Sequence, residues 1–137
     1  MARTEVVSFD TEALILVDSM DQIVGHEMKG PCHDGQGILH RAFSIFIFNE
    51  KGEVLLQQRT SNKRLWADFW ANTCCSHPRK DELTPEAAQR RLWEEVGIRA
   101  SLNHVYKFEY HAHGGTENLY KTLDLVSHKI HKQIQKS

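Results

Sequence analysis

The feature that most constrains the fold of this 137-residue chain is a run of β-forming residues followed by a turn and a second such run. Residues 38–48 have a centre rich in β-branched and aromatic side chains, and residues 53–59 continue after the Asn-Glu-Lys-Gly turn at 49–52. This pattern predicts a β-hairpin. Residues 13–18 and 23–26, which flank Ser-Met-Asp-Gln at 19–22, predict a second hairpin.

One helix is clearly marked at both ends, at residues 83–97. Thr84 is suited to cap it, Pro85 suits the first helical position, and Glu86 favours the positive end of the helix dipole. Gly97 is a typical terminating residue. The apolar face is formed by Ala88, Leu92 and Val96.

The remaining sequence predicts strands at 98–103, 105–111 and 119–126, and loops at 28–37 and 60–70. A chain of this length suits one domain, with a core over about residues 13–126 and a polar tail, 127–137, that we expect to be poorly packed. The expected fold class is α/β (α+β), a sandwich with a mixed sheet flanked by helices.

Charge and cysteine content narrow the class of function. With 17 basic and 18 acidic side chains the net charge is −1, so bulk electrostatics does not favour a nucleic acid or membrane partner. The N-terminus lacks the pattern of a signal peptide, and three cysteines, two of them adjacent, do not suit a secreted disulfide framework. We therefore expect a cytoplasmic protein whose thiols are free.

The first chemical motif spans residues 76–98, where Arg-Arg-Leu-Trp-Glu-Glu-Val-Gly-Ile follows Ser-His-Pro-Arg-Lys-Asp-Glu. Its spacing resembles the Nudix box, in which helix carboxylates hold a divalent metal against a diphosphate. The sequence has Ser76 in place of the opening glycine and Arg91 in place of a glutamate. Arg91 and Glu95 lie four residues apart on one helix face, so they suit phosphate and Mg²⁺ binding, or a simple surface ion pair.

A second constellation precedes this helix. It comprises Asn-Thr-Cys-Cys-Ser-His-Pro at 72–78, the pair His33 and His40 separated by six residues, and Leu-His-Arg-Ala-Phe-Ser at 39–44. Taken alone, each histidine could be an ordinary hydrogen-bonded residue. Together, in this order and spacing, the motifs resemble type I isopentenyl-diphosphate isomerase over residues 13–117, which implies a Nudix-like fold.

The resemblance implies a role for particular residues of this sequence. The cysteine of the C-x-H-P motif is Cys75, the assisting tyrosine is Tyr110, and the first glutamate of an E-x-E pattern is Glu117. Glu117 and three histidines would bind one divalent metal (Mn²⁺, Zn²⁺ or Mg²⁺), while Glu95 would bind Mg²⁺ on the diphosphate. The histidines are His33, His40 and His77, and the basic residues implied for the diphosphate are Lys29, Arg59, Lys63 and Arg91.

These residue types suit the implied reaction, isopentenyl diphosphate to dimethylallyl diphosphate. Moving the double bond requires adding a proton to one carbon and removing one from another, which a thiol and a carboxylate on opposite faces can do. Of the other cysteines, we expect Cys74 to be a structural small hydrophobe, and Cys32 is a weaker candidate for metal binding beside His33.

The sequence departs from the family pattern where Leu119 stands at the second glutamate of E-x-E. Leucine can neither bind metal nor transfer a proton, although Glu109 is a candidate to compensate. The chain also ends before the family's usual C-terminus, so we expect the C-terminal helices to be missing and activity to be impaired. The alternatives are a Nudix-type diphosphohydrolase and an inactive remnant that binds metal and diphosphate; the pattern does not indicate an oligomeric state.

Overall fold

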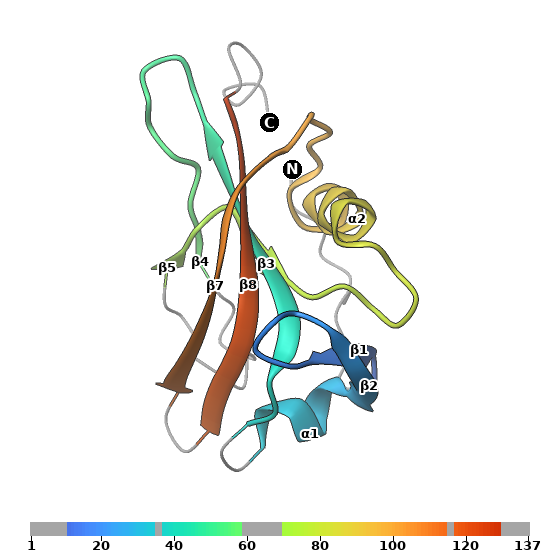
Figure 1. Cartoon of the computed structure of the whole chain (residues 1–137). Coiled ribbons are helices and arrows are strands. Elements are labelled where there is room, and N and C mark those ends of the chain that lie inside the picture. Colours follow the sequence, from blue (N-terminus) through green and yellow to red (C-terminus); the bar gives the residue numbers. More distant parts are fainter. Residues whose placement is uncertain (1–10, 35–36, 59–69, 115–116, 130–137) are drawn as a thin grey trace.

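The computed structural model describes residues 11–34, 37–58, 70–114 and 117–129. It shows an α+β fold built on a mixed sheet with strand order β2-β1-β3-β8-β7, in which β6 also pairs with β3 (Figure 1). The predicted fold class is therefore confirmed. The sheet strands are β1 (Ala13–Val17), β2 (Ile23–Met28), β3 (His40–Phe48), β6 (Cys74–Ser76), β7 (Asn103–Gly114) and β8 (Glu117–Lys129).

Two short strands and two helices complete the described elements. They are β4 (Gln57–Gln58), β5 (Trp70–Ala71), α1 (Lys29–His33) and α2 (Thr84–Val96). The strands β4 and β5 form a separate two-stranded sheet. Within the described residues, none of the helices is long and apolar enough to cross a membrane.

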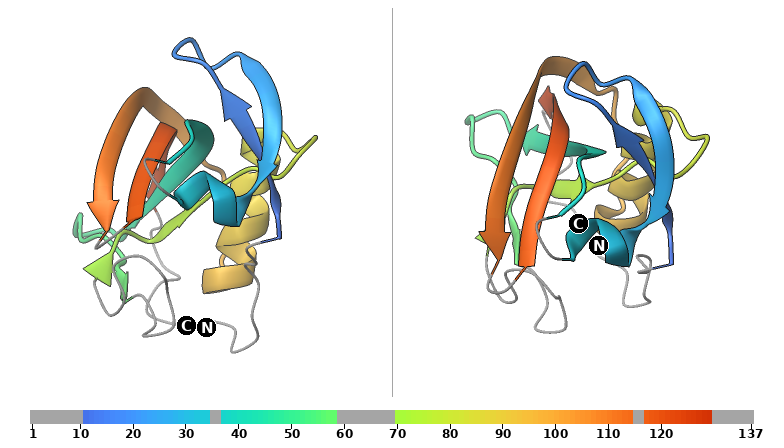
Figure 2. Two further views of the ribbon diagram at one scale, coloured as in Figure 1. Left: turned by 90° about the horizontal axis from the view of Figure 1, so that it is seen from below. Right: turned by 60° about the horizontal axis from the view of Figure 1, so that its bottom comes forward.

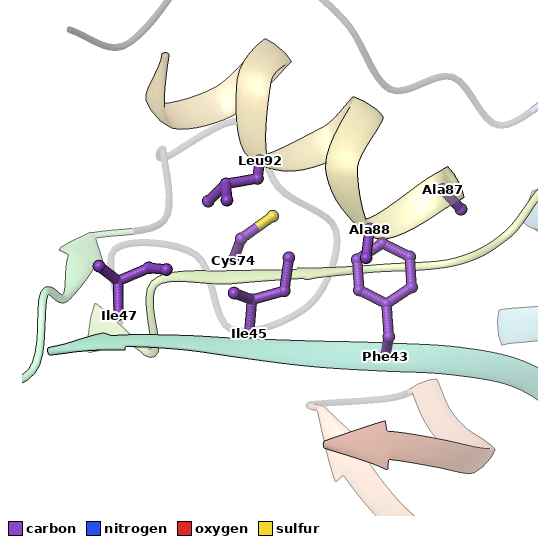
Figure 3. Packing of buried hydrophobic residues seen from close by; sticks show 7 residues of the cluster. All are labelled: Phe43, Ile45, Ile47, Cys74, Ala87, Ala88 and Leu92. Atoms are coloured by element: carbon purple, nitrogen blue, oxygen red, sulfur yellow. The ribbon is translucent and has the colours of Figure 1, made fainter. Parts of the chain in front are cut away.

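The central strand β3 pairs with β1, β6 and β8. It runs parallel to β8 and antiparallel to β6, where Ser44 pairs with Cys75. Because side chains alternate along a strand, Phe43, Ile45 and Ile47 share one face. That face is covered by α2, and Figure 3 shows the three side chains pointing toward the helix together with Cys74.

The helix α2 confirms the predicted helix, with a shift of one residue at its start. Leu83 occupies the N-cap position, so Thr84 is the first helical residue and the predicted threonine cap is wrong. The Leu83 amide instead donates to the Glu86 carboxylate at 3.4 Å. Gly97 ends the helix with φ 71°, a left-handed conformation that favours glycine. Ala88 and Leu92 of this helix are buried, as the apolar pattern predicted.

The hairpin predicted at residues 13–26 is confirmed by the pairing of β1 with β2. The second predicted hairpin is only partly formed. The chain turns at 49–52, and Phe48 bridges Val54, but no continuous strand follows over residues 53–58. Instead β4 pairs with β5, so pairing with a distant segment replaces the local hairpin.

The strands predicted at 105–111 and 119–126 are both present, within the longer β7 and β8. Because β8 continues to Lys129, the first three residues of the predicted tail pair with β3. The rest of that tail, residues 130–137, lies outside the described residues. So does the predicted loop at 60–70, apart from Trp70 at the start of β5.

Two other predictions were wrong. Residues 98–102 are not a strand; Ile98, Ala100 and Leu102 pack as irregular chain against the core under α2. The predicted loop at 28–37 contains α1, whose proline lies in the first turn, where a helix needs no amide donor from it. Figure 2 shows α1 below the start of β3 and beside the β1–β2 hairpin. The end of α1 therefore lies near the start of the strand.

Candidate functional site

Three histidines from separate parts of the chain converge at the start of β3. His33 ends α1, His40 begins β3, and His77 follows β6. The ring centroids lie 5.1–5.6 Å apart, and all three side chains are buried. One nitrogen from each ring lies within 4.8 Å of the others. Three buried imidazoles facing one point are a ligand set suited to a divalent transition metal.

The hydrogen bond of His40 favours the form of the ring that can bind metal. Its Nδ1 lies 2.6 Å from the carbonyl oxygen of Ile38, which can only accept a hydrogen. The proton therefore lies on Nδ1, and the lone pair of the neutral ring lies on Nε2. The Nε2 atoms of all three histidines are buried and make no hydrogen bond within the described part of the chain. The residues present thus fit a metal ion.

Cys75 lies on β6, two residues before His77. Its thiol donates to the Asn72 amide oxygen at 2.7 Å, and its sulfur lies 3.2 Å from the Ser44 hydroxyl. The Asn72 amide nitrogen donates to the carbonyl oxygens of Ile45 and Cys74, which turns the amide oxygen toward the thiol. Asn72 and Ser44 therefore fix the position of the Cys75 side chain.

The two faces of β6 carry different chemistry. Cys74 and Ser76 face α2, whereas Cys75 lies on the opposite face with its cross-strand partner Ser44. Alternation along β3 places His40 on the face of Ser44, and alternation after β6 places His77 on the face of Cys75. The thiol and the histidine cluster therefore share one face of the sheet.

The motif residues of α2 form a network on the other face of β6. Arg91 is buried, with 2% of its surface exposed, and its guanidinium donates to Ser76 Oγ and to Glu94 and Glu95, each at 3.0 Å. The second oxygen of Glu95 accepts from the Cys74 thiol at 3.2 Å. Arg91 and Glu95 do form an i,i+4 ion pair, but Arg91 is buried, Glu95 is half-buried and both belong to a network. The pair therefore differs from a solvated surface pair.

Lys29 belongs to a second group of charges at the start of α1. Its ammonium lies 3.6 Å from Glu12, which also binds Arg79 at 2.7 Å. Glu82 then accepts from the Arg79 amide and from the Arg90 guanidinium, linking this group to α2. Arg79 and Glu82 belong to the motif at residues 76–98, and Glu12 does not. The ion pairs that join these residues were not predicted, since pairs between distant segments leave no local signal.

Burial and neighbouring charges set the ionisation of several groups. Burial, followed by the charge of Glu27, raises the pKa of Cys32 to about 12. Burial, followed by the Glu95 carboxylate, holds the pKa of Cys74 well above its usual value. Burial alone would raise the pKa of Glu82, but hydrogen bonds from Arg90 and Arg79 and their charges outweigh it and hold that pKa low.

Several predicted site residues lie outside what the structure describes. Arg59 and Lys63 are not among the described residues, and for Tyr110 and Glu117 only the backbone is described. Glu117 begins β8, and Tyr110 pairs with Lys121, which in turn pairs with His40 across the sheet. The backbone register therefore places Tyr110 two strands away from His40.

Sequence comparison matches this chain to proteins from different organisms that share one name. The chain is similar to a protein of Serratia proteamaculans named isopentenyl-diphosphate Delta-isomerase, with 54% identity over 101 residues, covering 74% of this chain and 56% of that protein. A protein of the same name from Burkholderia multivorans is 46% identical over 119 residues, covering 87% of this chain and 63% of that protein. The chain thus spans a little over half the length of these curated relatives.

Solved structures support the same fold. The DR0079 protein of Deinococcus radiodurans matches with a TM-score of 0.65 at 18% identity, over 87% of this chain and 74% of that one. The MutT protein of Methanosarcina mazei matches with a TM-score of 0.58 at 23% identity, over 67% and 64%. The NUDIX domain model matches residues 38–131, more than half of the sequence. The chain belongs to the NUDIX domain family.

Proposed function

We propose that this chain binds isopentenyl diphosphate and moves its double bond to give dimethylallyl diphosphate. The observation that carries the proposal is the convergence of His33, His40 and His77 on the sheet face that also bears Cys75. A diphosphohydrolase would use carboxylates on the helix to hold metal, and Arg91 replaces one of these carboxylates in this chain. Such an enzyme also has no evident use for a thiol beside an imidazole cluster. The similarity to proteins named isopentenyl-diphosphate Delta-isomerase supports the same reaction.

In the proposed reaction the Cys75 thiol gives its proton to the terminal alkene carbon. The electron pair of the double bond forms the new C–H bond, which leaves a tertiary carbocation. A carboxylate on the opposite face then takes a proton from the neighbouring methylene, and the electron pair of that C–H bond forms the new double bond. Asn72 and Ser44 hold the sulfur in place, and the Ser44 hydroxyl is positioned to donate to it once its proton has left.

A cation held by His33, His40 and His77 would supply fixed positive charge that orients a carboxylate opposite the thiol. We assign that carboxylate to Glu117 and a supporting hydroxyl to Tyr110, both from the family resemblance. The metal is one that accepts imidazole and carboxylate, such as Mn²⁺, Zn²⁺ or Mg²⁺. Because Leu119 replaces the second glutamate, we expect slow turnover.

The diphosphate serves as the handle that positions the five-carbon tail. We assign its binding to Lys29, Arg59, Lys63 and Arg91, with Glu95 as the ligand of a phosphate-bound Mg²⁺. Arg91 is already bonded to Ser76, Glu94 and Glu95, so part of its role is to hold that carboxylate.

The test is incubation of the purified chain with Mg²⁺, Mn²⁺ and isopentenyl diphosphate, with products followed by NMR and released phosphate by colorimetry. Dimethylallyl diphosphate that disappears in Cys75→Ala but persists in Cys32→Ala supports the isomerase. Released phosphate would instead support a hydrolase. Isomerisation that survives Cys75→Ala, or binding with no reaction at any metal concentration, would contradict the proposed mechanism.

A further inference from the structure

The Glu95 carboxylate is fixed from two different elements. Arg91, one turn earlier on α2, donates to one oxygen at 3.0 Å, and Cys74 on β6 donates to the other at 3.2 Å. A carboxylate bonded at both oxygens has lost most of its freedom to rotate. Each oxygen can accept two hydrogen bonds, so each retains a lone pair for a further partner.

Cys74 is placed to act as a hydrogen-bond donor as well as a core residue. It is fully buried, among the apolar residues that line β3 and α2 (Figure 3). Its sulfur lies 3.2 Å from the second carboxylate oxygen of Glu95, within hydrogen-bond distance for a thiol donor. The acceptor is a carboxylate, and hydrogen bonds to charged acceptors are stronger than those between neutral groups.

We propose that Cys74 is a positioning residue, which holds the Glu95 carboxylate in the orientation that binds a diphosphate-bound Mg²⁺. This inference rests on the assignment of Glu95 in the proposed function. It gives the first cysteine of the adjacent pair a role beyond that of a small hydrophobe, which is all that the sequence predicts for it. Cys74 and Cys75 would then serve different groups of the site from opposite faces of β6.

Two substitutions separate positioning from packing. Cys74→Val fills the apolar position but has no hydrogen to donate, whereas Cys74→Ser retains a donor but is less suited to an apolar core. If Cys74 only fills space, valine is the better replacement. If it positions Glu95, serine preserves cation binding and valine does not.

The measurement is isothermal titration of Mg²⁺ with inorganic diphosphate into the purified chain, at a fixed pH, for the wild type and for Cys74→Ser, Cys74→Val and Glu95→Gln. We expect Cys74→Val to bind the magnesium diphosphate about threefold to tenfold more weakly, the effect of one lost hydrogen bond. Cys74→Ser should remain within about twofold of the wild type, and Glu95→Gln should bind the most weakly.

The two proposals fail in different ways. Unchanged binding in Glu95→Gln would overturn the assignment of Glu95 in the proposed function. Weakened binding in Glu95→Gln with unchanged binding in Cys74→Val would overturn the positioning role alone. Thermal melts of each variant check folding, with Cys74→Ala replacing valine if that variant does not fold. Ile47→Val, a change in the same core, should lower stability and leave binding unchanged.

Discussion

At the scale of single residues, the three cysteines differ in the environment of their sulfur atoms. Cys32 and Cys74 are fully buried, and each lies near a carboxylate, Glu27 and Glu95 respectively. Cys75 is only partly buried and is bonded to neutral partners, Asn72 and Ser44. The reactive form of cysteine is the thiolate, so these environments predict different reactivity.

We predict that iodoacetamide at pH 8 alkylates Cys75 about tenfold or more faster than Cys32 or Cys74. A pKa of about 12 leaves Cys32 almost entirely as the thiol at that pH. Peptide mass spectrometry after timed quenching measures the three rates, and labelling in urea supplies the control in which the sites become alike. Equal rates in the folded chain would contradict the described burial.

Leu119 gives a second prediction at this scale. If the missing second glutamate limits turnover, Leu119→Glu should raise the rate of isomerisation by about 100-fold or more, the usual contribution of a general base. Leu119→Gln is the matched control, since it has similar size and polarity without a carboxylate. Product formation by NMR measures both. A glutamate variant no faster than the glutamine variant would contradict the prediction that the missing second glutamate limits turnover.

Only part of the site could be predicted from the residues themselves. The sequence motifs single out three histidines, and the structure brings these histidines together. The role predicted for Cys75 stays a prediction. The bonds from Asn72 to Cys75 and from Cys74 to Glu95 depend on side-chain orientation, which the sequence pattern does not reveal. The same holds for Arg91, whose burial could not be inferred from its place on an amphipathic helix.

At the scale of elements, Glu82 connects the segment before α2 to the helix itself. It accepts from the Arg79 amide and, through both oxygens, from the Arg90 guanidinium. We predict that Glu82→Gln lowers the free energy of unfolding by about 1–2 kcal/mol at pH 7, since a partly buried charge-assisted pair is lost.

This destabilisation should depend on pH. The folded pKa of Glu82 is lowered, so its stabilisation is fully present above the unfolded value of about 4.3 and is lost as the pH falls through the folded value. Urea unfolding should therefore show a difference between wild type and Glu82→Gln that shrinks below about pH 4. The exposed Glu50→Gln serves as control. A difference that stays constant down to about pH 3 would contradict the described pair.

The elements that sequence predicted well are those with local signals. The β1–β2 hairpin has a turn between two apolar runs, and α2 has Pro85 and Gly97 at its ends. The strand β6 is only three residues long and depends on pairing with β3, some thirty residues away in sequence, so no local pattern marks it. In residues 98–102 the apolar side chains of Ile98, Ala100 and Leu102 alternate with polar ones and pack on the core. The sequence pattern does not distinguish this arrangement from a strand.

At the scale of the whole molecule, the sheet brings together segments that are far apart in the chain. The fold class followed from the mixture of hairpins and one helix, but the parallel pairing of β3 with β8 could not be inferred from local patterns. That pairing aligns His40 with Lys121, and β8 in turn aligns with β7. The order of the strands therefore decides which predicted site residues can meet.

The histidine cluster joins three parts of the fold, the end of α1, the start of β3 and the segment after β6. A cation bound there would link these parts, so its binding should stabilise the folded chain. With a cation bound, the cluster would serve the proposed chemistry and would also hold α1 against the sheet.

The most direct test is titration of Zn²⁺ into the metal-free chain, followed by NMR of ¹⁵N-labelled histidine side chains. We predict that the imidazole signals of His33, His40 and His77 move together and reach their final positions at one equivalent of metal, with binding through Nε2 of His40. His26→Gln should leave this response unchanged, and His77→Gln should abolish the shared transition. Signals of the three rings that move independently, or a response in only one or two of them, would contradict a shared metal site.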